Sequence, residues 1–479
     1  MSDVPRPGLM RHWPDLMHET DASVPRLDVP RPGLMRQVSS VTIQTTSLMR
    51  QAFSVMIQAP SVTIQAPSVT SQSSSVKGKR LSVSIHANME SEGKKDTKIV
   101  LTKPFSLESE SDNSDSRAPN LLNRILNLLK NVRPGSDLTH FQARQLLFST
   151  FNLISFARER HLSLQTPLVY CRGSDLLRKC NSEQSPVERF KSVVAWSIST
   201  TRPTSFAVAP YNPTLGETHH VSKGNLNVLL EQVSHNPPVS ALHATDEKEN
   251  IEMIWCQQPV PKFSGTSIEA QVHGKRQLKL LNHGETYEMN SPHLLIRILP
   301  VPRVNWVGSV NIRCLETGLV AELFYKSTLS FLGLGKNRKL IQGKIIDSSS
   351  SKVLYEVDGY WDRTVTLKDT KSGETRVIYD AKEVISGLQA PIVKDPQRVW
   401  PTESALVWSE LSQAILNNDW EKAREAKQLV EERQRKITAE RETNGKVWIP
   451  KHFAVSFSKE GAWDCSPIHK WVPSAPIIA

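Results

Sequence analysis

Between Tyr170 and Asp380 the chain consists of short runs in which apolar and polar residues alternate, and this pattern constrains its fold more than any other feature. Alternation with a period of two is typical of strands that bury one face. Gly-, Asn- and Ser-rich turns separate the runs at 223–225, 316–318, 347–351 and 371–373. Since no helical segments alternate with these strands, we predict an antiparallel, meandering sheet. Clear examples of the strands are NVLLEQV, SIEAQVHG, HLLIRI, LVAELFY, KIIDS, VLYEVDG and TRVIYD.

A sheet of this many strands is expected to curve into a large, incomplete antiparallel β-barrel over residues 170–386. A barrel much wider than about eight strands has an interior that its own side chains cannot fill. The interior therefore has room for an apolar lipid tunnel. After Gly387 the periodicity becomes helical, so we expect a helical C-terminal part over residues 388–479. The fold class predicted is mainly β with α.

Residues 1–118 have the composition of a disordered, low-complexity extension. DVPRPGLMR occurs twice, and Ser then recurs every seven residues from Ser40 to Ser75. Two of the seven-residue units end in Ala-Pro, which excludes a continuous helix, and large apolar residues are scarce. The acid-free stretch between Val29 and Met89 resembles an organellar transit peptide. Acidic residues before it argue against that alternative.

Residues 119–142 contain an amphipathic helix, for which we weighed three roles. Asn123, Arg124, Asn127 and Lys130 lie largely opposite its apolar face. The helix could pack on the core, touch a membrane, or close a pocket as a lid. Its apolar face consists of Leu121, Leu122, Ile125, Leu128 and Leu129.

The charge of the chain indicates an anionic partner. The net charge is +11, and residues 1–119 contain 14 Lys and Arg against 12 Asp and Glu, so most of the excess lies in the folded part. Nucleic acid, phospholipid headgroups and phosphorylated ligands all fit such a surface.

No run of about 20 apolar residues is present. The five cysteines form no CxxC pair, which argues against a zinc site or a disulfide scaffold: Cys171, Cys180, Cys256, Cys314 and Cys465.

Four motifs, in order, identify the family that residues 119–479 resemble. EQVSHNPP, beginning at Glu231, resembles the EQVSHHPP fingerprint of the oxysterol-binding-protein-related family. NPTLGE at 212–217 resembles its NPxLGE, and GYWD at 359–362 its GxWD. AKQLVEERQR at 426–435 resembles its C-terminal helix with Lys, Glu and Arg four residues apart. The absence of a second recognisable domain is similar to the short plant members.

This resemblance implies a lipid carrier with a tunnel, a lid over residues 119–142 and no catalytic chemistry. It further implies that His235, Lys427, Glu431 and Arg435 hold a phosphatidylinositol 4-phosphate headgroup at the tunnel mouth. Without the resemblance, the spacing of Lys427, Glu431 and Arg435 also indicates a row of ion pairs on the surface of a helix. Lys223 is expected to add a basic contact from the next hairpin. The remaining mouth residues are Asn212, Leu215, Gly216, Glu217, Ser234, Pro237 and Pro238.

Two features depart from the family pattern. Asn236 stands where the family usually has His, and an amide carries no charge. We expect phosphoinositide binding to be weaker by about 1 to 2 kcal/mol, roughly five- to thirtyfold. Residues 143–169 lack the expected LPxxFNxPxSxLQ-like stretch, although both flanks fit the family. A frameshifted or misjoined exon would leave this trace. The segment would then either form an ad hoc helix or break the hinge of the lid, and in the second case the protein would be an impaired copy.

The sequence argues against several other functions. His219, His220 and His235 have no convincing metal-ligand spacing or nucleophile motif around them, so we expect neither an enzyme nor a metal or other cofactor. No nucleic-acid-binding signature is present. The open alternative is a lipid sensor or scaffold without net transfer. We expect a monomer in the cytosol, peripherally and transiently on intracellular membranes, with sterol, phosphatidylinositol 4-phosphate and anionic membrane surfaces as partners. KPFSLESESD contains one Phe, so no endoplasmic-reticulum receptor motif is clear.

Overall fold

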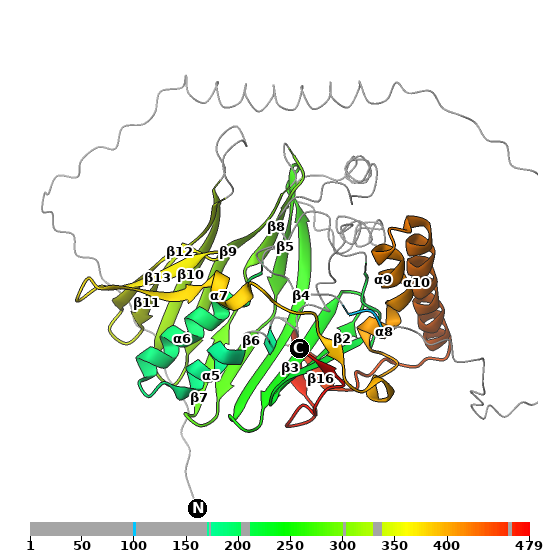
Figure 1. Cartoon of the computed structure of the whole chain (residues 1–479), viewed down its shortest axis with the longest axis horizontal. Helices are drawn as coiled ribbons and strands as arrows, with labels where there is room; N and C mark the ends of the chain where they lie inside the picture. Colours follow the sequence, from blue (N-terminus) through cyan, green and yellow to red (C-terminus); the bar gives the residue numbers. More distant parts are fainter. Residues whose placement is uncertain are drawn as a thin grey trace, which may run out of the picture. The chain divides into compact units, whose positions relative to one another are not determined.

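The structure is a computed structural model and describes residues 99–101, 170–171, 174–202, 211–299, 303–328, 338–457 and 462–479 (Figure 1). The predicted lid at 119–142 lies outside these residues, with Leu121, Leu122, Ile125, Leu128 and Leu129. Apart from 99–101, so does the predicted disordered extension at 1–118. The atypical segment 143–169 also lies outside them.

One sheet of 16 strands dominates the described chain, and its neighbouring strands pair antiparallel except β18, which lies parallel to β1. The order runs from β14 through β9, β7, β6 and β4 to β1, β18 and β15. The strands are β1 (Thr218–Lys223), β2 (Leu226–Ser234), β3 (Val239–Asp246), β4 (Ile251–Phe263), β5 (Ser267–His273), β6 (Arg276–Leu280), β7 (Glu285–Met289), β8 (His293–Arg297), β9 (Arg303–Cys314), β10 (Leu319–Thr328), β11 (Arg338–Asp347), β12 (Lys352–Tyr360), β13 (Thr364–Asp369), β14 (Thr375–Asp380), β15 (Ile392–Val393) and β18 (Ile477–Ile478).

The strand order confirms the predicted incomplete β-barrel. Within the described chain, β14 and β15 stand at the two ends of the order and each pairs with one neighbour, so the sheet does not close there. Inside the sheet, β4 pairs with β6 through its first half and with β5 through its second half. Strand β8 pairs with both β5 and β9. The sheet therefore has two branches between β4 and β9, one through β5 and β8 and the other through β6 and β7. The apolar lipid tunnel remains a prediction.

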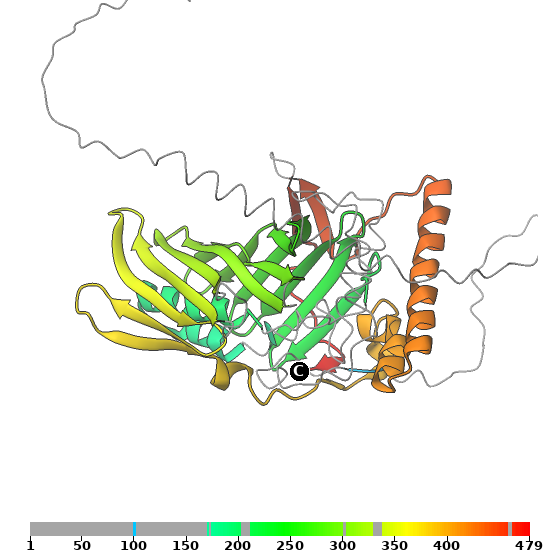
Figure 2. The same cartoon turned by 90° about the horizontal axis from the view of Figure 1, so that it is seen from above.

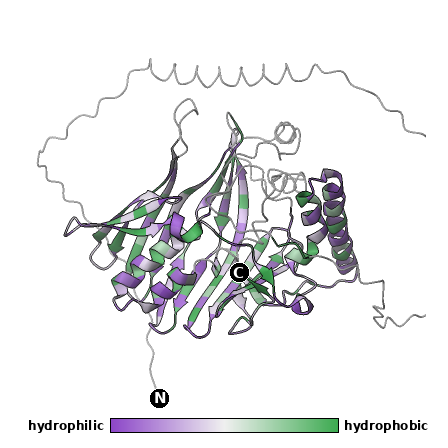
Figure 3. Ribbon diagram, in the orientation of Figure 1, coloured by the Kyte–Doolittle hydropathy of each residue, from purple (hydrophilic) through white to green (hydrophobic). Residues whose placement is uncertain are grey.

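The alternation seen in the sequence corresponds to alternating burial in the strands. In β6 and β7 every second residue is buried, and Figure 3 shows apolar and polar residues alternating along the sheet. Strands β1 to β3 instead are buried on both faces for most of their length. They are covered on both sides, which explains why THHVSK in β1 lacks a clean alternation.

Two helices, and no strand, lie between Ser174 and Ser199, which corrects the prediction that strands begin at Tyr170. Helices α5 (Ser174–Ser182) and α6 (Pro186–Ser199) lie against one face of the sheet (Figures 1 and 2). Pro186 suits the first turn of α6, where its missing N–H is not needed. The spacing of Phe190, Val193, Val194 and Ile198 then places one apolar stripe on the sheet.

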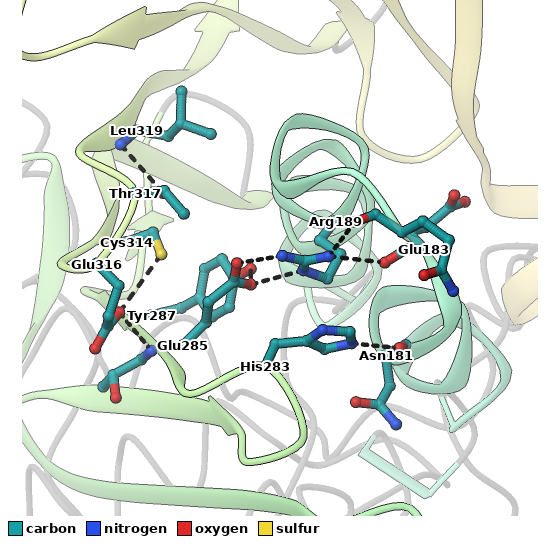
Figure 4. Close-up of polar contacts among 12 residues, drawn as sticks. Asn181, Glu183, Arg189, His283, Glu285, Tyr287, Cys314, Glu316, Thr317 and Leu319 are labelled. Atoms are coloured by element: carbon teal, nitrogen blue, oxygen red, sulfur yellow. Dashed lines mark hydrogen bonds and ion pairs between the residues drawn. The ribbon is translucent and has the colours of Figure 1, made fainter.

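A buried ion pair ties α6 to the sheet. Arg189 Nε lies 2.8 Å and Nη2 2.5 Å from the two carboxylate oxygens of Glu285 in β7. The hydroxyl of Tyr287 also donates to Glu285, at 2.5 Å (Figure 4). Two parallel hydrogen bonds fix the guanidinium relative to the carboxylate. This pair therefore sets how α6 lies on the sheet.

The C-terminal part contains strands as well as helices, which corrects the prediction that residues 388–479 are helical. The hairpin of β16 (Phe453–Phe457) and β17 (Trp463–Pro467) packs against Val239 and Cys256 of the sheet. Strand β18 adds to the edge of β1. The helices and strands beyond β14 are α7 (Ala381–Ile385), the 3₁₀ turn η3 (Pro396–Arg398), α8 (Ser404–Val407), α9 (Ser409–Leu416), α10 (Trp420–Thr443), β16 (Phe453–Phe457) and β17 (Trp463–Pro467).

Three residues of the predicted extension belong to the folded domain. Val100 is buried and Leu101 packs against the main core cluster. The domain therefore includes residues N-terminal to the predicted boundary at 118. Within the described residues, no helix combines the length and apolar character needed to cross a bilayer.

Candidate functional site

The NPTLGE turn is held against the helices by the carboxylate of Glu217. Its oxygens accept hydrogen bonds from Thr214 N at 2.8 Å and Trp408 Nε1 at 3.1 Å, and from the hydroxyl of Ser404. Glu217 is buried. A buried carboxylate that accepts hydrogen bonds from several groups fixes those groups relative to one another. Glu217 therefore shapes the predicted mouth by holding the turn.

Gly216 has a left-handed backbone, with φ +79°, and lies under the ring of Trp448. A Cβ at this position would come within 2.5 Å of Trp448 Cη2. The N–H of Gly216 donates to Gln232 O at 2.9 Å, and Gln232 N donates to Glu217 O at 2.8 Å. Glycine is required here by both the backbone and the ring. The sequence motif included Gly216 but not Trp448.

The Ser-His-Asn-Pro-Pro block is the turn between β2 and β3, as its two prolines predict. His235 Nδ1–H donates to the carbonyl of Pro213 at 3.0 Å, which joins this turn to the NPTLGE turn. Asn236 is exposed and its peptide bond to Pro237 is cis. Ser234 is buried, whereas Asn212, Leu215, Pro237 and Pro238 are partly exposed. The structure therefore brings the predicted mouth residues of the two motifs together.

Lys427, Glu431 and Arg435 all lie on α10, as predicted. Lys427 is buried, and its Nζ lies 3.9 Å from Glu431 Oε1. Burial lowers the pKa of Lys427, and Glu431 opposes that shift only in part. Arg435 is exposed and approaches Glu432, at 4.0 Å, in place of Glu431. The three residues therefore form one ion pair between a buried lysine and a partly buried glutamate, followed by an exposed arginine that pairs with Glu432.

A pocket of about 570 Å³ lies between the NPTLGE turn and α8, α9 and α10. Thr214, Leu215, Gly216 and Glu217 line one side of it. The α10 residues in its lining include Val430, Arg433 and Ile437, whereas Lys427, Glu431 and Arg435 are not in its described lining. At 100° per residue, these two sets lie roughly a third of a turn apart on the helix. The spacing of Lys427, Glu431 and Arg435 therefore did not identify Arg433, which lines the same pocket as the NPTLGE turn.

The prediction that Lys223 contributes to the mouth is wrong. Lys223 pairs with Leu226 beside the β1–β2 turn, and its Nζ lies 3.8 Å from Asp175 in α5. His235 follows the opposite end of β2, which is nine residues long. At about 3.3 Å per residue the two positions are separated by roughly 25 to 30 Å. Lys223 and His235 are close in sequence, but the length of β2 separates them in the structure.

The adjacent histidines His219 and His220 are part of a buried network. His219 Nδ1 contacts the carboxylate of Glu403, whose other oxygen accepts from His220 N at 3.1 Å. The ring of His220 stacks on Trp400, at 5.0 Å, and its Nε2–H donates to the carbonyl of Pro473 at 2.7 Å. In the described part of the chain, no cluster of three His, Cys, Asp or Glu side chains could hold a metal ion.

We predict that His220 makes the fold sensitive to acid. Burial lowers the pKa of His220 to about 4, below the ordinary value of about 6.5. Between these pH values the unfolded chain binds a proton that the folded chain does not. The free energy of unfolding should therefore fall by about 2 to 3 kcal/mol as the pH drops from 6.5 to 4. Urea unfolding across this pH range should show a shallower decline for His220→Gln. An identical decline would contradict the assignment.

Two relatives show how far the similarity of the sequence extends. The profile of the Oxysterol-binding protein family matches residues 148–471. The chain is 53% identical over 383 residues to oxysterol-binding protein-related protein 4C of Arabidopsis thaliana, covering 79% of this chain and 98% of that protein. It is 52% identical over 384 residues to protein 4B of the same plant, covering 79% and 97%.

The match begins at residue 148, inside the atypical segment 143–169. The absence of the LPxxFNxPxSxLQ-like stretch from this segment is a feature of the sequence, and its origin in a misjoined exon stays a prediction.

Solved structures share the fold at low sequence identity. The Osh1 ORD domain in complex with ergosterol matches with a TM-score of 0.57 and 20% identity, covering 77% of this chain and 90% of that one. The Osh3 ORD of Saccharomyces cerevisiae in complex with PI(4)P matches with a TM-score of 0.53 and 21% identity, covering 76% and 94%. Both confirm the β-barrel fold.

Proposed function

This chain belongs to the oxysterol-binding protein family and is of its plant type, and on that premise we propose that it is a lipid-transfer protein. It takes a sterol or another lipid, or phosphatidylinositol 4-phosphate, out of one membrane and carries it through the cytosol to another. The Osh1 and Osh3 domains of the same fold, which hold ergosterol and PI(4)P, support both kinds of ligand.

The observation that carries this proposal is the buried ammonium group of Lys427. In the described chain its Nζ has no hydrogen-bond partner, and the nearest carboxylate oxygen recorded for it, Glu431 Oε1, is 3.9 Å away. A buried charge without hydrogen bonds is unfavourable in a folded protein. A phosphate that accepts a hydrogen bond from Lys427 removes this cost, because it supplies both charge and acceptors.

The other predicted headgroup residues have complementary chemistry. A phosphate monoester carries close to two negative charges near neutral pH. Arg435 is exposed and can bind phosphate oxygens through two N–H groups, while Glu431 accepts from inositol hydroxyls. His235 donates through Nδ1 to the carbonyl of Pro213, which fixes its ring at the turn beside Asn236. Asn236 offers neutral donors beside it.

An apolar tunnel inside the barrel is part of this proposal, because a lipid needs one to cross water. Each CH₂ group exposed to water costs about 0.8 kcal/mol, so a lipid with two acyl chains leaves a bilayer very slowly by itself. A tunnel inside the barrel shields the chains during transit. The protein then needs no covalent chemistry, and we propose no enzymatic step and no cofactor. We place it in the cytosol as a monomer, transiently bound to intracellular membranes.

A sensor or scaffold that binds lipid without moving it is the second candidate. It would use the same residues, so binding alone does not separate the two functions. Net transfer separates them. The purified full chain should move labelled phosphatidylinositol 4-phosphate, or a labelled sterol, from donor to acceptor liposomes. Lipid that is bound by the folded protein but not moved would favour the sensor, and no binding of either lipid would overturn both.

We predict that Asn236→His strengthens phosphoinositide binding. A histidine at this exposed turn position adds a donor that can carry charge, and charge-assisted hydrogen bonds are roughly twice as strong as neutral ones. We expect a gain of about 1 to 2 kcal/mol, or roughly five- to thirtyfold. Titration with phosphatidylinositol 4-phosphate vesicles at pH 6 and pH 8 measures it. The gain should be larger at pH 6, and a gain of similar size for sterol would contradict the assignment.

A further inference from the structure

The loop from Lys446 to Lys451 displays two large apolar side chains to solvent. Val447 is 85% exposed and Ile449 is 76% exposed, more than any other large apolar residue in the described chain. Trp448, between them, is partly buried. Exposure thus alternates along the loop, as in an extended segment with one residue turned inward and its neighbours outward.

Three anchors hold this loop in place. At its start, Gly445 N donates to Glu442 O and Lys446 N donates to Arg441 O, both at 3.0 Å, which is a Schellman ending of α10. In its middle, the ring of Trp448 lies on Gly216 and 5.4 Å from the guanidinium of Arg441. Val447 and Ile449 are therefore not on a fraying chain end.

The end of the loop is anchored by the sheet. The backbone N–H groups of Lys451 and His452 donate to the buried carboxylate of Glu231, at 2.8 and 2.9 Å. Glu231 precedes the SHNPP turn on β2. Figure 2 shows the loop running from the end of α10 to the hairpin of β16 and β17. Through Trp448 and Glu231 the loop contacts both elements that carry the predicted mouth residues.

The charges around the loop indicate which surface it meets. Lys446 and Lys451 are exposed at its two ends, beside Val447 and Ile449. Ile468, also exposed, lies next to Lys451, because its N–H donates to His452 O at 3.0 Å. Apolar side chains flanked by lysines complement a bilayer, where the apolar groups reach the acyl chains and the lysines meet anionic headgroups.

We propose that residues 446–451 form a docking loop that inserts Val447 and Ile449 into an anionic bilayer. This inference rests on the proposed function and adds to it the part of the surface that contacts the membrane. The insertion brings the NPTLGE and SHNPP turns to the bilayer surface, because Trp448 and Glu231 join them rigidly to the loop. A lipid then passes between bilayer and protein with little exposure to water.

The test measures binding of the full chain to vesicles of phosphatidylcholine with and without phosphatidylserine. Val447→Ser/Ile449→Ser should lower the partition coefficient by roughly ten- to a hundredfold, since two apolar side chains no longer enter the bilayer. The matched control is Val377→Ser/Ile392→Ser, which removes side chains that are 61% and 64% exposed on the end strands β14 and β15. The control should bind as the unchanged chain does.

A second arm tests the lysines. Lys446→Gln/Lys451→Gln should remove most of the preference for phosphatidylserine, about fivefold per lysine. Lys352→Gln/Lys382→Gln, two exposed lysines elsewhere, makes the same change in net charge. If both lysine pairs reduce binding equally, the attraction belongs to the whole protein and the docking loop is overturned.

Two further measurements keep the outcomes distinct. A polarity-sensitive dye attached to Ile449→Cys should shift its emission to the blue on vesicles, and the same dye on Ile392→Cys should not.

Lipid bound to each purified variant is measured in parallel. If the serine pair docks normally while the chain carries lipid, the docking inference is wrong and the proposed function stands. If the pair fails to dock but no variant carries lipid, the docking loop stands and the transfer function fails. Loss of vesicle binding through association with a second copy would appear as a dimer and would overturn the inference.

Discussion

Lys427→Met should reduce binding of phosphatidylinositol 4-phosphate by roughly thirty- to several-thousandfold, the effect of removing one partner of a buried charge pair. Methionine keeps most of the apolar stem and removes only the ammonium group. Lys422→Met is the matched control, because Lys422 is an exposed lysine on the same helix that pairs with Asp419 at 3.5 Å. Binding of phosphoinositide vesicles and transfer between liposomes both measure the loss. Sterol binding should change little.

The stability of the ligand-free protein distinguishes a binding role from a structural one. Since the ammonium of Lys427 is buried without a hydrogen bond, Lys427→Met should leave the free energy of unfolding unchanged or raise it. A structural lysine would instead destabilise the fold when removed. A large fall in stability together with the loss of binding would therefore contradict the assignment of Lys427 to the headgroup.

The lowered pKa of Lys427 also gives the sign of a pH effect. Between that lowered value and the ordinary value of lysine, the unfolded chain keeps a proton that the folded chain has lost. The stability of the ligand-free protein should thus rise with pH in this window. Phosphoinositide binding should fall over the same window, because it needs the charged form. Both slopes should be absent in Lys427→Met.

The second large effect is expected for Gly216→Ala, which should destabilise the protein by about 3 kcal/mol or more. Alanine is strained at φ +79°, and its Cβ would lie 2.5 Å from Trp448 Cη2. Gly373→Ala is the matched control, since Gly373 has φ +75° with nothing within 4 Å of the added carbon. Its cost is the backbone strain alone, about 1 to 2 kcal/mol.

Urea unfolding of the two variants isolates the contact with Trp448. Gly216→Ala/Trp448→Leu should recover part of the loss, because the smaller side chain no longer meets the added carbon. Vesicle binding should fall with Gly216→Ala, since Trp448 is the middle anchor of the docking loop. Equal destabilisation at positions 216 and 373 would show that the ring of Trp448 adapts freely, and would contradict this reading of the turn.

Local patterns in the sequence predicted most of the sheet. The alternating runs from NVLLEQV to TRVIYD are all strands, and the turns between them lie where Gly, Asn and Ser interrupt the alternation. This worked because a strand with one buried face has a period of two in its own residues. The helix carrying Lys427, Glu431 and Arg435 was predicted for the same kind of reason, from its own periodicity.

The misassigned segments are those whose burial depends on distant partners. The sequence pattern predicts strands from Tyr170 onward, but residues 174–182 and 186–199 are helices whose apolar side chains pack against the sheet. It predicts helices up to residue 479, but Ile477 and Ile478 extend the sheet beside β1, more than 250 residues earlier in the chain. Short apolar runs fit either structure, and the partner decides between them.

The same distinction between local patterns and distant contacts applies to the candidate site. The sequence by itself determined which residue types are available: the NPTLGE turn, the SHNPP turn and the cationic helix are all motifs that can be read from the chain. Only the tertiary structure decided which groups meet. It placed Lys223 at the far end of a nine-residue strand and turned Glu217 inward as a clamp. It also set Trp448 on Gly216, which leaves Val447 and Ile449 in solvent. Side-chain direction and burial follow from contacts between segments that are distant in sequence, and no local pattern contains those contacts.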